Sequence, residues 1–160
     1  AMVITTLGTA DDEQIIDELY LAAKSGVPID ILVRGMCALR PGVPGLSESI
    51  RVHSVLGRYL EHSRIFYFEN DGDPDVFIGS ADMMHRNLDR RVETLVKLVQ
   101  TDHIRDLRDI MDLGMSERVA TWVLGPDGQW SRRSEDEEGN RLPDMQDELM
   151  QLTLNKKRIR

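Results

Sequence analysis

A helical pattern followed directly by a short apolar run constrains the fold of this chain more than any other feature. After the acidic start at residues 11–13, apolar residues recur at helical spacing: Ile15, Ile16, Leu19, Tyr20 and Ala23. Gly26 and Pro28 end this pattern, and the run 29–33 reads as a buried strand that leads to Arg34. Ligands of α/β sheets bind at the carboxyl ends of strands. The sequence therefore predicts an α/β fold with Arg34 at the edge that carries the ligand site.

The rest of the chain predicts more strands and two further helices. Strands are predicted for residues 64–68, 76–79 and 92–99, and the turn at 70–73 joins the first two into a hairpin. The turn at 125–128 predicts a second hairpin between 122–124 and 129–130. Helices are predicted over 101–115, after a Thr-Asp cap, and over 144–154, followed by a frayed basic end at 156–158. Residues 35–49 are predicted to form an irregular loop, whereas 50–60 fit either a short helix or an extended segment.

Length and composition predict one domain without a membrane span. The chain has 160 residues, enough for one core, and contains no stretch of 18 apolar residues. No signal peptide is recognisable, and Ala1-Met2 looks like an expression scar. The single cysteine, Cys37, excludes an intrachain disulfide and is typical of a small loop residue in a cytoplasmic protein.

The charge distribution favours a local anion site over a broad nucleic-acid surface. The net charge is -8, and the acidic run at 135–138 is predicted to be a solvated loop. Between Lys24 and Lys97, however, every cation is an arginine: Arg34, Arg40, Arg51, Arg58, Arg64, Arg86, Arg90 and Arg91. Arginine grips phosphate oxygens with two parallel hydrogen bonds. This segment therefore predicts a built site for a phosphate-bearing ligand.

His62 is the candidate for chemistry. It leads into the predicted strand 64–68, and the following hairpin can return Gly79-Ser80-Ala81-Asp82 to its side. A histidine near neutral pKa can act as a nucleophile or as a proton donor to a phosphoryl oxygen, and a hydroxyl or carboxylate can fix its tautomer. A purely structural or surface histidine is the competing interpretation.

The other histidines and the helical turn at 87–91 carry weaker signals. His53, His85 and His103 are predicted to be structural or solvent-facing, and none has a metal-ligand spacing. Arg86 and Arg90 lie four residues apart and can share one helix face, although Arg90 can instead pair with Glu93 or Asp89.

Three segments of the chain resemble the long, phosphohistidine-type polyphosphate kinases of bacteria. They are residues 31–48, which contain Arg40-Pro41-Gly42-Val43-Pro44-Gly45, then 57–65, which contain Glu61-His62-Ser63-Arg64, and 79–93. The resemblance runs from about residue 10 to about residue 135. It implies that residues 11–135 are the C-terminal of two phospholipase-D-like catalytic domains, a mixed sheet flanked by helices. An N-terminal edge at 1–10 precedes this domain, and an acidic loop with a C-terminal helix or tail follows at 136–160.

The resemblance also implies a function. The family reversibly transfers the terminal phosphate of ATP to inorganic polyphosphate, with Mg²⁺ held mainly by other domains and the nucleotide. The phosphorylated histidine belongs to another domain, so this chain is expected to be inactive alone.

The resemblance further implies roles for individual residues, and none of them is a metal ligand. Arg34 would clamp phosphate, and His62 would assist proton transfer or stabilise the transferring group. Arg40, Arg64, Arg86 and Arg90 would line the path of the polyanion, with Ser80 and Asp82 in support. Met83 departs from the family, which usually has tryptophan after Ser-Ala-Asp.

Two other functions remain open at this point. The phospholipase D signature pairs His-x-Lys with Gly-Ser-x-Asn, so a phosphodiesterase or nuclease half-site completed by homodimerisation is the main alternative. Arg64 and Asp82 disfavour it, because they replace the expected lysine and asparagine. The second open function is that of a phosphate-binding module without catalytic activity. The expected partners are ATP or ADP, polyphosphate and the remaining domains of a homo-oligomeric parent, and no nucleic acid is expected.

Overall fold

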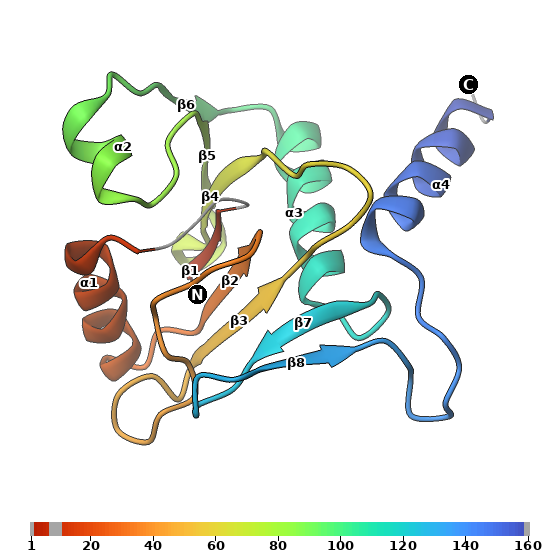
Figure 1. Ribbon diagram of the computed structural model, residues 1–160. Helices are drawn as coiled ribbons and strands as arrows, with labels where there is room; N and C mark the ends of the chain where they lie inside the picture. Colours follow the sequence, from red (N-terminus) through yellow and green to blue (C-terminus); the bar gives the residue numbers. More distant parts are fainter. Residues whose placement is uncertain (1, 7–10, 159–160) are drawn as a thin grey trace.

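One mixed sheet of eight strands runs through the molecule in the order β6-β5-β4-β1-β2-β3-β7-β8 (Figure 1). The computed structural model describes residues 2–6 and 11–158, and for 2–6, 85, 86, 88 and 156–158 it describes the backbone alone. The strands are β1 (Met2–Thr6), β2 (Ile29–Val33), β3 (Ile50–Ser54), β4 (Arg64–Phe68), β5 (Asp75–Gly79), β6 (Leu95–Leu98), β7 (Thr121–Leu124) and β8 (Trp130–Arg133). The helices are α1 (Glu13–Lys24), α2 (His85–Arg90), α3 (Thr101–Met115) and α4 (Met145–Arg158), with a short 3₁₀ turn, η1 (Asn70–Gly72).

The centre of the sheet is parallel and its flanks are antiparallel. β2 pairs in parallel with both β1 and β3, whereas β4, β5 and β6 on one side and β7 and β8 on the other continue the sheet in antiparallel fashion. The parallel pairs require crossover connections, which α1 and the long loop after β2 provide. The expected mixed sheet flanked by helices is confirmed.

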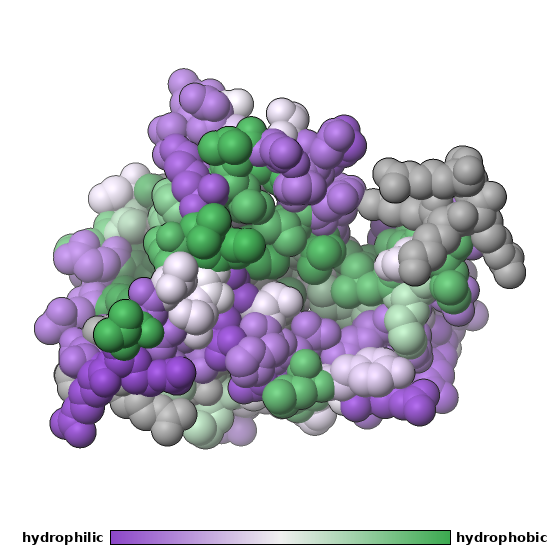
Figure 2. Space-filling model, turned by 90° about the horizontal axis from the view of Figure 1, so that it is seen from above, coloured by the Kyte–Doolittle hydropathy of each residue, from purple (hydrophilic) through white to green (hydrophobic). Residues whose placement is uncertain are grey.

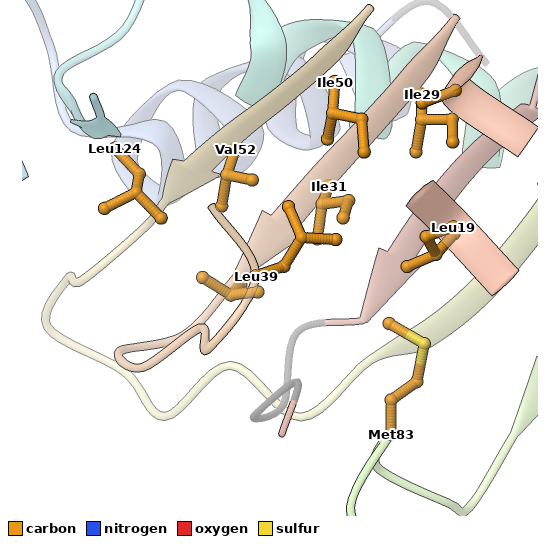
Figure 3. Packing of buried hydrophobic residues seen from close by; sticks show 10 residues of the cluster. Leu19, Ile29, Ile31, Leu39, Ile50, Val52, Met83 and Leu124 are labelled. Atoms are coloured by element: carbon orange, nitrogen blue, oxygen red, sulfur yellow. The ribbon is translucent and has the colours of Figure 1, made fainter. Parts of the chain in front are cut away.

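Side chains of β2 alternate between two cores on opposite faces of the sheet. Ile29 and Ile31 lie in one cluster with Leu19 of α1 (Figure 3). Val33 and Ala23 belong to the same cluster. Leu32 points the other way and packs with residues of α3 and α4. This period of two explains why an almost continuous apolar run forms a strand that is buried on both faces. Met83 lies in the first cluster and is buried, as expected of a residue that affects packing.

Most local predictions are confirmed, with informative differences at the ends of elements. Asp12 caps α1, because its carboxylate accepts the N–H of Ile15 at 3.1 Å. The predicted Thr-Asp cap of α3 is wrong, since Gln100 is the N-cap residue and makes no capping side-chain bond. The ambiguous segment 50–60 forms the strand β3 and then an irregular loop. α4 remains helical to Arg158 instead of fraying after Leu154.

The carboxyl ends of β2 and β3 are tied together just beyond the sheet. Gly35 adopts φ +95, a backbone conformation that other residues rarely adopt, so the chain turns sharply after Arg34. The N–H of Gly35 donates to Ser54 Oγ at 3.0 Å, and Val55 N–H donates to Val33 O at 3.0 Å. These bonds fix the edge at which Arg34 emerges.

Large apolar side chains are exposed around β6 and in the loop after β3. They are Val92, Leu95, Val96 and Val99, and Leu56, Tyr59 and Leu60. Figure 2 shows apolar patches separated by hydrophilic residues on the face seen from above. Among the described residues, no helix has both the length and the apolar character to span a membrane.

Candidate functional site

Arg34 meets the loop that carries His62. Its NH1 donates to the backbone carbonyl of Glu61 at 2.5 Å, and its side chain is half-buried. Within the described part of the chain, Arg34 forms no ion pair. Its positive charge is therefore held in place by a neutral acceptor and remains available to an anionic ligand.

Arg64 joins His62 to Asp82. The buried guanidinium donates through Nε to Asp82 Oδ1 at 2.8 Å, and through NH1 to His62 Nδ1 at 2.6 Å and to His62 O at 3.0 Å. Arginine has no acceptor, so Nδ1 of His62 must be the acceptor and its ring proton must sit on Nε2. The exposed imidazole thus presents an N–H donor.

Asp82 stays ionised within this cluster. Burial alone would raise its pKa, but the hydrogen bond and charge of Arg64, with the charge of Arg34, hold that pKa below its ordinary value. The structure brings together three groups that are distant in the sequence, Arg34, the pair His62 and Arg64, and Asp82. The predicted return of residues 79–82 beside His62 is confirmed.

The other candidate cations are not joined to this cluster by any described contact. The guanidinium of Arg40 lies beside Gly128 in the turn between β7 and β8, where a Cβ on Gly128 would be 3.5 Å from NH2. Arg90 is exposed at the end of α2. The side chain of Arg86 lies outside the described residues.

Ser80 and Arg91 both bind Glu93, which lies close to them in the sequence. Ser80 donates to the carboxylate of Glu93 and accepts the N–H of Thr94 at 3.0 Å, so it does not set the tautomer of His62. Of the neighbouring arginines, Arg91 rather than Arg90 pairs with Glu93, at 3.3 Å.

The remaining histidines and the cysteine follow the structural interpretation where they are described. His53 is buried, and its Nδ1 lies 3.2 Å from Gly114 O. His103 is exposed on α3, and the side chain of His85 lies outside the described residues. Burial raises the pKa of the Cys37 thiol to about 11, which makes it unreactive.

Sequence reasoning missed two contributors to the site. The carbonyl of Glu61, which holds Arg34, is a backbone atom, and Gln146 of α4 binds the same loop from 85 residues away. Neither follows from a motif or a spacing.

The comparisons with known proteins agree on one family. The family model described as "Polyphosphate kinase C-terminal domain 2" matches residues 1–143, a longer stretch at both ends than the resemblance within 10–135. A curated "Polyphosphate kinase" of Streptomyces coelicolor is 56% identical over 139 residues, which are 87% of this chain and 19% of that protein. "Polyphosphate kinase 1" of Chlorobaculum tepidum is 47% identical over 81% of this chain and 18% of its own length.

A solved structure supports the same assignment. The crystal structure of polyphosphate kinase from Porphyromonas gingivalis matches with a TM-score of 0.88 and 31% identity, over 99% of this chain and 24% of that one. The chain thus spans about a fifth of the length of the curated relatives it matches. With a family model over most of its length and relatives about half identical to it, the chain belongs to the polyphosphate kinase C-terminal domain 2 family.

Proposed function

We propose that this chain is the C-terminal half-site of a polyphosphate kinase, which reversibly transfers the terminal phosphate of ATP to polyphosphate. The observation that carries the proposal is the meeting of Arg34 and the His62 loop at the carboxyl end of β2, through the 2.5 Å bond from Arg34 NH1 to Glu61 O. Arg34 forms no ion pair within the described residues and contacts the loop that carries the N–H donor of His62, and both groups suit phosphate oxygens.

Arg34 would clamp the phosphates, and His62 would donate from Nε2 to a phosphoryl oxygen. In phosphoryl transfer, most of the catalysis is positioning and charge stabilisation. The Nδ1 lone pair of His62 is occupied by Arg64, which leaves that nitrogen unable to attack phosphorus. This supports the proposal that the phosphorylated histidine lies on another domain and that the chain is inactive alone.

The family implies Mg²⁺, but the residues of this chain offer little to hold it. The described residues contain no group of three His, Cys, Asp or Glu side chains placed to bind a metal ion. Asp82, the carboxylate of the site, is engaged by Arg64. We therefore expect Mg²⁺ to be held by the nucleotide and other domains.

The same reasoning extends to the partners of the chain. Because it spans about a fifth of its relatives, other domains of a parent enzyme would complete the site. The exposed apolar side chains around β6 suit such contacts. We further propose that the parent is cytoplasmic and homo-oligomeric and binds no nucleic acid.

A phospholipase-D-type phosphodiesterase half-site is the second candidate. Its altered signature positions are bonded to each other here, because Arg64 Nε donates to Asp82 Oδ1. The two replacements thus compensate each other's charge, and neither side chain is free to act on a phosphodiester. The geometry favours the kinase half-site.

Calorimetry with tripolyphosphate tests the anion site in the chain itself. Arg34→Ala and His62→Ala each remove a contact to phosphate, and a charged hydrogen bond is worth about 1.5–3 kcal/mol, or roughly 10- to 150-fold in affinity. Arg132→Ala, an exposed arginine of β8, is the matched control for a general loss of positive charge.

The outcomes separate the candidate functions. Weaker binding in both site variants, with the control unchanged, supports the half-site. Equal binding by all four proteins would refute the role of Arg34 and His62. Hydrolysis of a generic phosphodiester by a dimeric preparation would favour the phosphodiesterase instead.

A further inference from the structure

The loop that carries His62 is held by a side chain from the far end of the sequence. Gln146, in the first turn of α4, is only 6% exposed. Its Oε1 accepts the N–H of Tyr59 at 2.8 Å, and its Nε2 donates to Tyr59 O and to Glu61 Oε1, both at 2.8 Å. The amide thus pairs with both backbone groups of Tyr59, as a neighbouring strand would.

The first turn of α4, which carries Gln146, is itself anchored to the rest of the fold. Its backbone N–H donates to Asp144 Oδ1 at 2.8 Å, and the adjacent Met145 is buried among residues that include Leu32 and Val55. Ala120 N–H donates to Pro143 O at 2.8 Å, which ties the start of α4 to the segment before β7. Gln146 therefore binds the loop from a position that is itself held by the core and by backbone hydrogen bonds.

Gly57 leaves the space that this arrangement needs. A Cβ at Gly57 would lie 2.7 Å from Cδ of Gln146 and would collide with Oε1. The glycine is thus required by the close approach of the amide. A glycine within the loop after β3 and a glutamine of α4, far apart in the sequence, thus fit one another.

This contact reaches the site through Glu61. The carboxylate of Glu61 accepts from Gln146, while the carbonyl of the same residue accepts from Arg34, and His62 follows directly. We infer that Gln146 is a positioning residue, which fixes residues 59–61 so that Arg34 and His62 face one ligand. The inference rests on the proposed anion site, and Gln146 lies beyond residue 143, where the family match ends.

Amide hydrogen exchange of the chain, measured by NMR, tests the contact directly. Among the described contacts, the acceptor of the Tyr59 N–H is Gln146 Oε1, so this bond is expected to protect that N–H from exchange. We expect exchange at Tyr59 to become at least about tenfold faster in Gln146→Ala. It should be unchanged in Gln151→Ala, a matched glutamine on the exposed part of the same helix. The amide of Val52 in β3 reports whether each variant is folded.

A conservative variant separates the specific contact from a general loosening of α4. Gln146→Met keeps the length and packing of the side chain but has neither the acceptor for Tyr59 N–H nor the donor to Tyr59 O and Glu61. Exchange at Tyr59 should therefore be as fast in Gln146→Met as in Gln146→Ala, whereas a loosening caused by lost packing alone would leave Tyr59 protected in Gln146→Met. Equal exchange at Tyr59 in wild type and folded Gln146→Ala would overturn the inference.

Binding of tripolyphosphate distinguishes this inference from the proposed function. If Gln146 positions the site, affinity falls roughly three- to tenfold in Gln146→Ala and not in Gln151→Ala. Faster exchange with unchanged affinity would show that the loop is ordered without positioning the site, which refutes the role. Failure of the wild type to bind would count against the proposed function, while exchange at Tyr59 would still decide whether Gln146 holds the loop.

Discussion

Removing the carboxylate of Asp82, which pairs with buried Arg64, should destabilise the fold much more than removing that of Asp30, which pairs with exposed Arg51. Arg64 and Asp82 form a single 2.8 Å bond, with side chains 9% and 12% exposed. Arg51 and Asp30 form two bonds of 2.6 Å, but their side chains are 63% and 20% exposed. From the number and length of the bonds alone, losing one partner of Arg51–Asp30 should cost more stability. From burial, losing one partner of Arg64–Asp82 should cost more, because the remaining charge is then buried without a partner.

The expected loss in free energy of unfolding depends on the guanidinium that remains after its partner is removed. Breaking a buried pair leaves an uncompensated charge and costs about 3–5 kcal/mol. The remaining bonds of Arg64 to His62 relieve part of this, so we expect about 3 kcal/mol for Asp82→Ala and about 2 kcal/mol for Asp82→Asn, whose amide oxygen can still accept. Asp30→Asn breaks an exposed pair and should cost at most about 1 kcal/mol.

Urea unfolding followed by tryptophan fluorescence measures the free energy of unfolding of each variant. The double variant Arg64→Ala/Asp82→Ala should lose less than the sum of its single changes, since no buried charge then remains unpaired. Equal losses in Asp82→Asn and Asp30→Asn, within about 0.5 kcal/mol, would refute the argument from burial.

Three further predictions concern residues outside the candidate site. Burial lowers the pKa of His53, so, as the pH falls, the unfolded chain takes up a proton at this residue before the folded chain does. The free energy of unfolding should therefore decrease as the pH drops below the ordinary pKa of 6.5. His53→Gln should flatten this dependence, measured by urea unfolding at pH 5 to 7. In Gly114→Ala, the new Cβ would collide with Leu32, so we expect a loss of about 1–3 kcal/mol by thermal or urea unfolding, despite the better helix propensity of alanine. A gain in stability would show that α3 can move away from β2. With a pKa of about 11, the Cys37 thiol is ionised in roughly one molecule in a thousand at pH 8, so the folded chain should react with iodoacetamide far more slowly than the urea-unfolded chain.

The elements that sequence reasoning predicted well are those whose signals are local. The cap and apolar spacing of α1 and the β-branched run of β2 lie within a few residues, and each forms where it was predicted. The central position of β1 was not predicted, because it depends on pairing with β2 and β4, which are distant in the chain. Pairing partners leave no trace in a strand's own residues.

The candidate site divides along the same line. His62 and Asp82 could be placed together, because a hairpin of recognisable turn chemistry separates them. Arg40 shares its motif with Arg34, yet the loop carries it to the turn at Gly128, and a motif does not state where its loop runs. Gln146 had no signal at all, since one buried glutamine in a helix looks like any other until its partners are known.

The pair of Arg64 and Asp82 also explains why two changes in the resembled signature belong together. A lysine at residue 64 would offer one ammonium, a point charge without the fork that reaches Asp82 through Nε and His62 through NH1 at once. An asparagine at residue 82 would leave that buried guanidinium without a counter-charge. Arginine therefore needs the aspartate, and together they hold the histidine ring with Nδ1 as the acceptor and its N–H on Nε2. A hydrolase that uses its histidine as a nucleophile needs a free ring nitrogen. The double exchange is therefore consistent with the proposed half-site, in which the histidine donates to a phosphoryl oxygen and does not attack phosphorus.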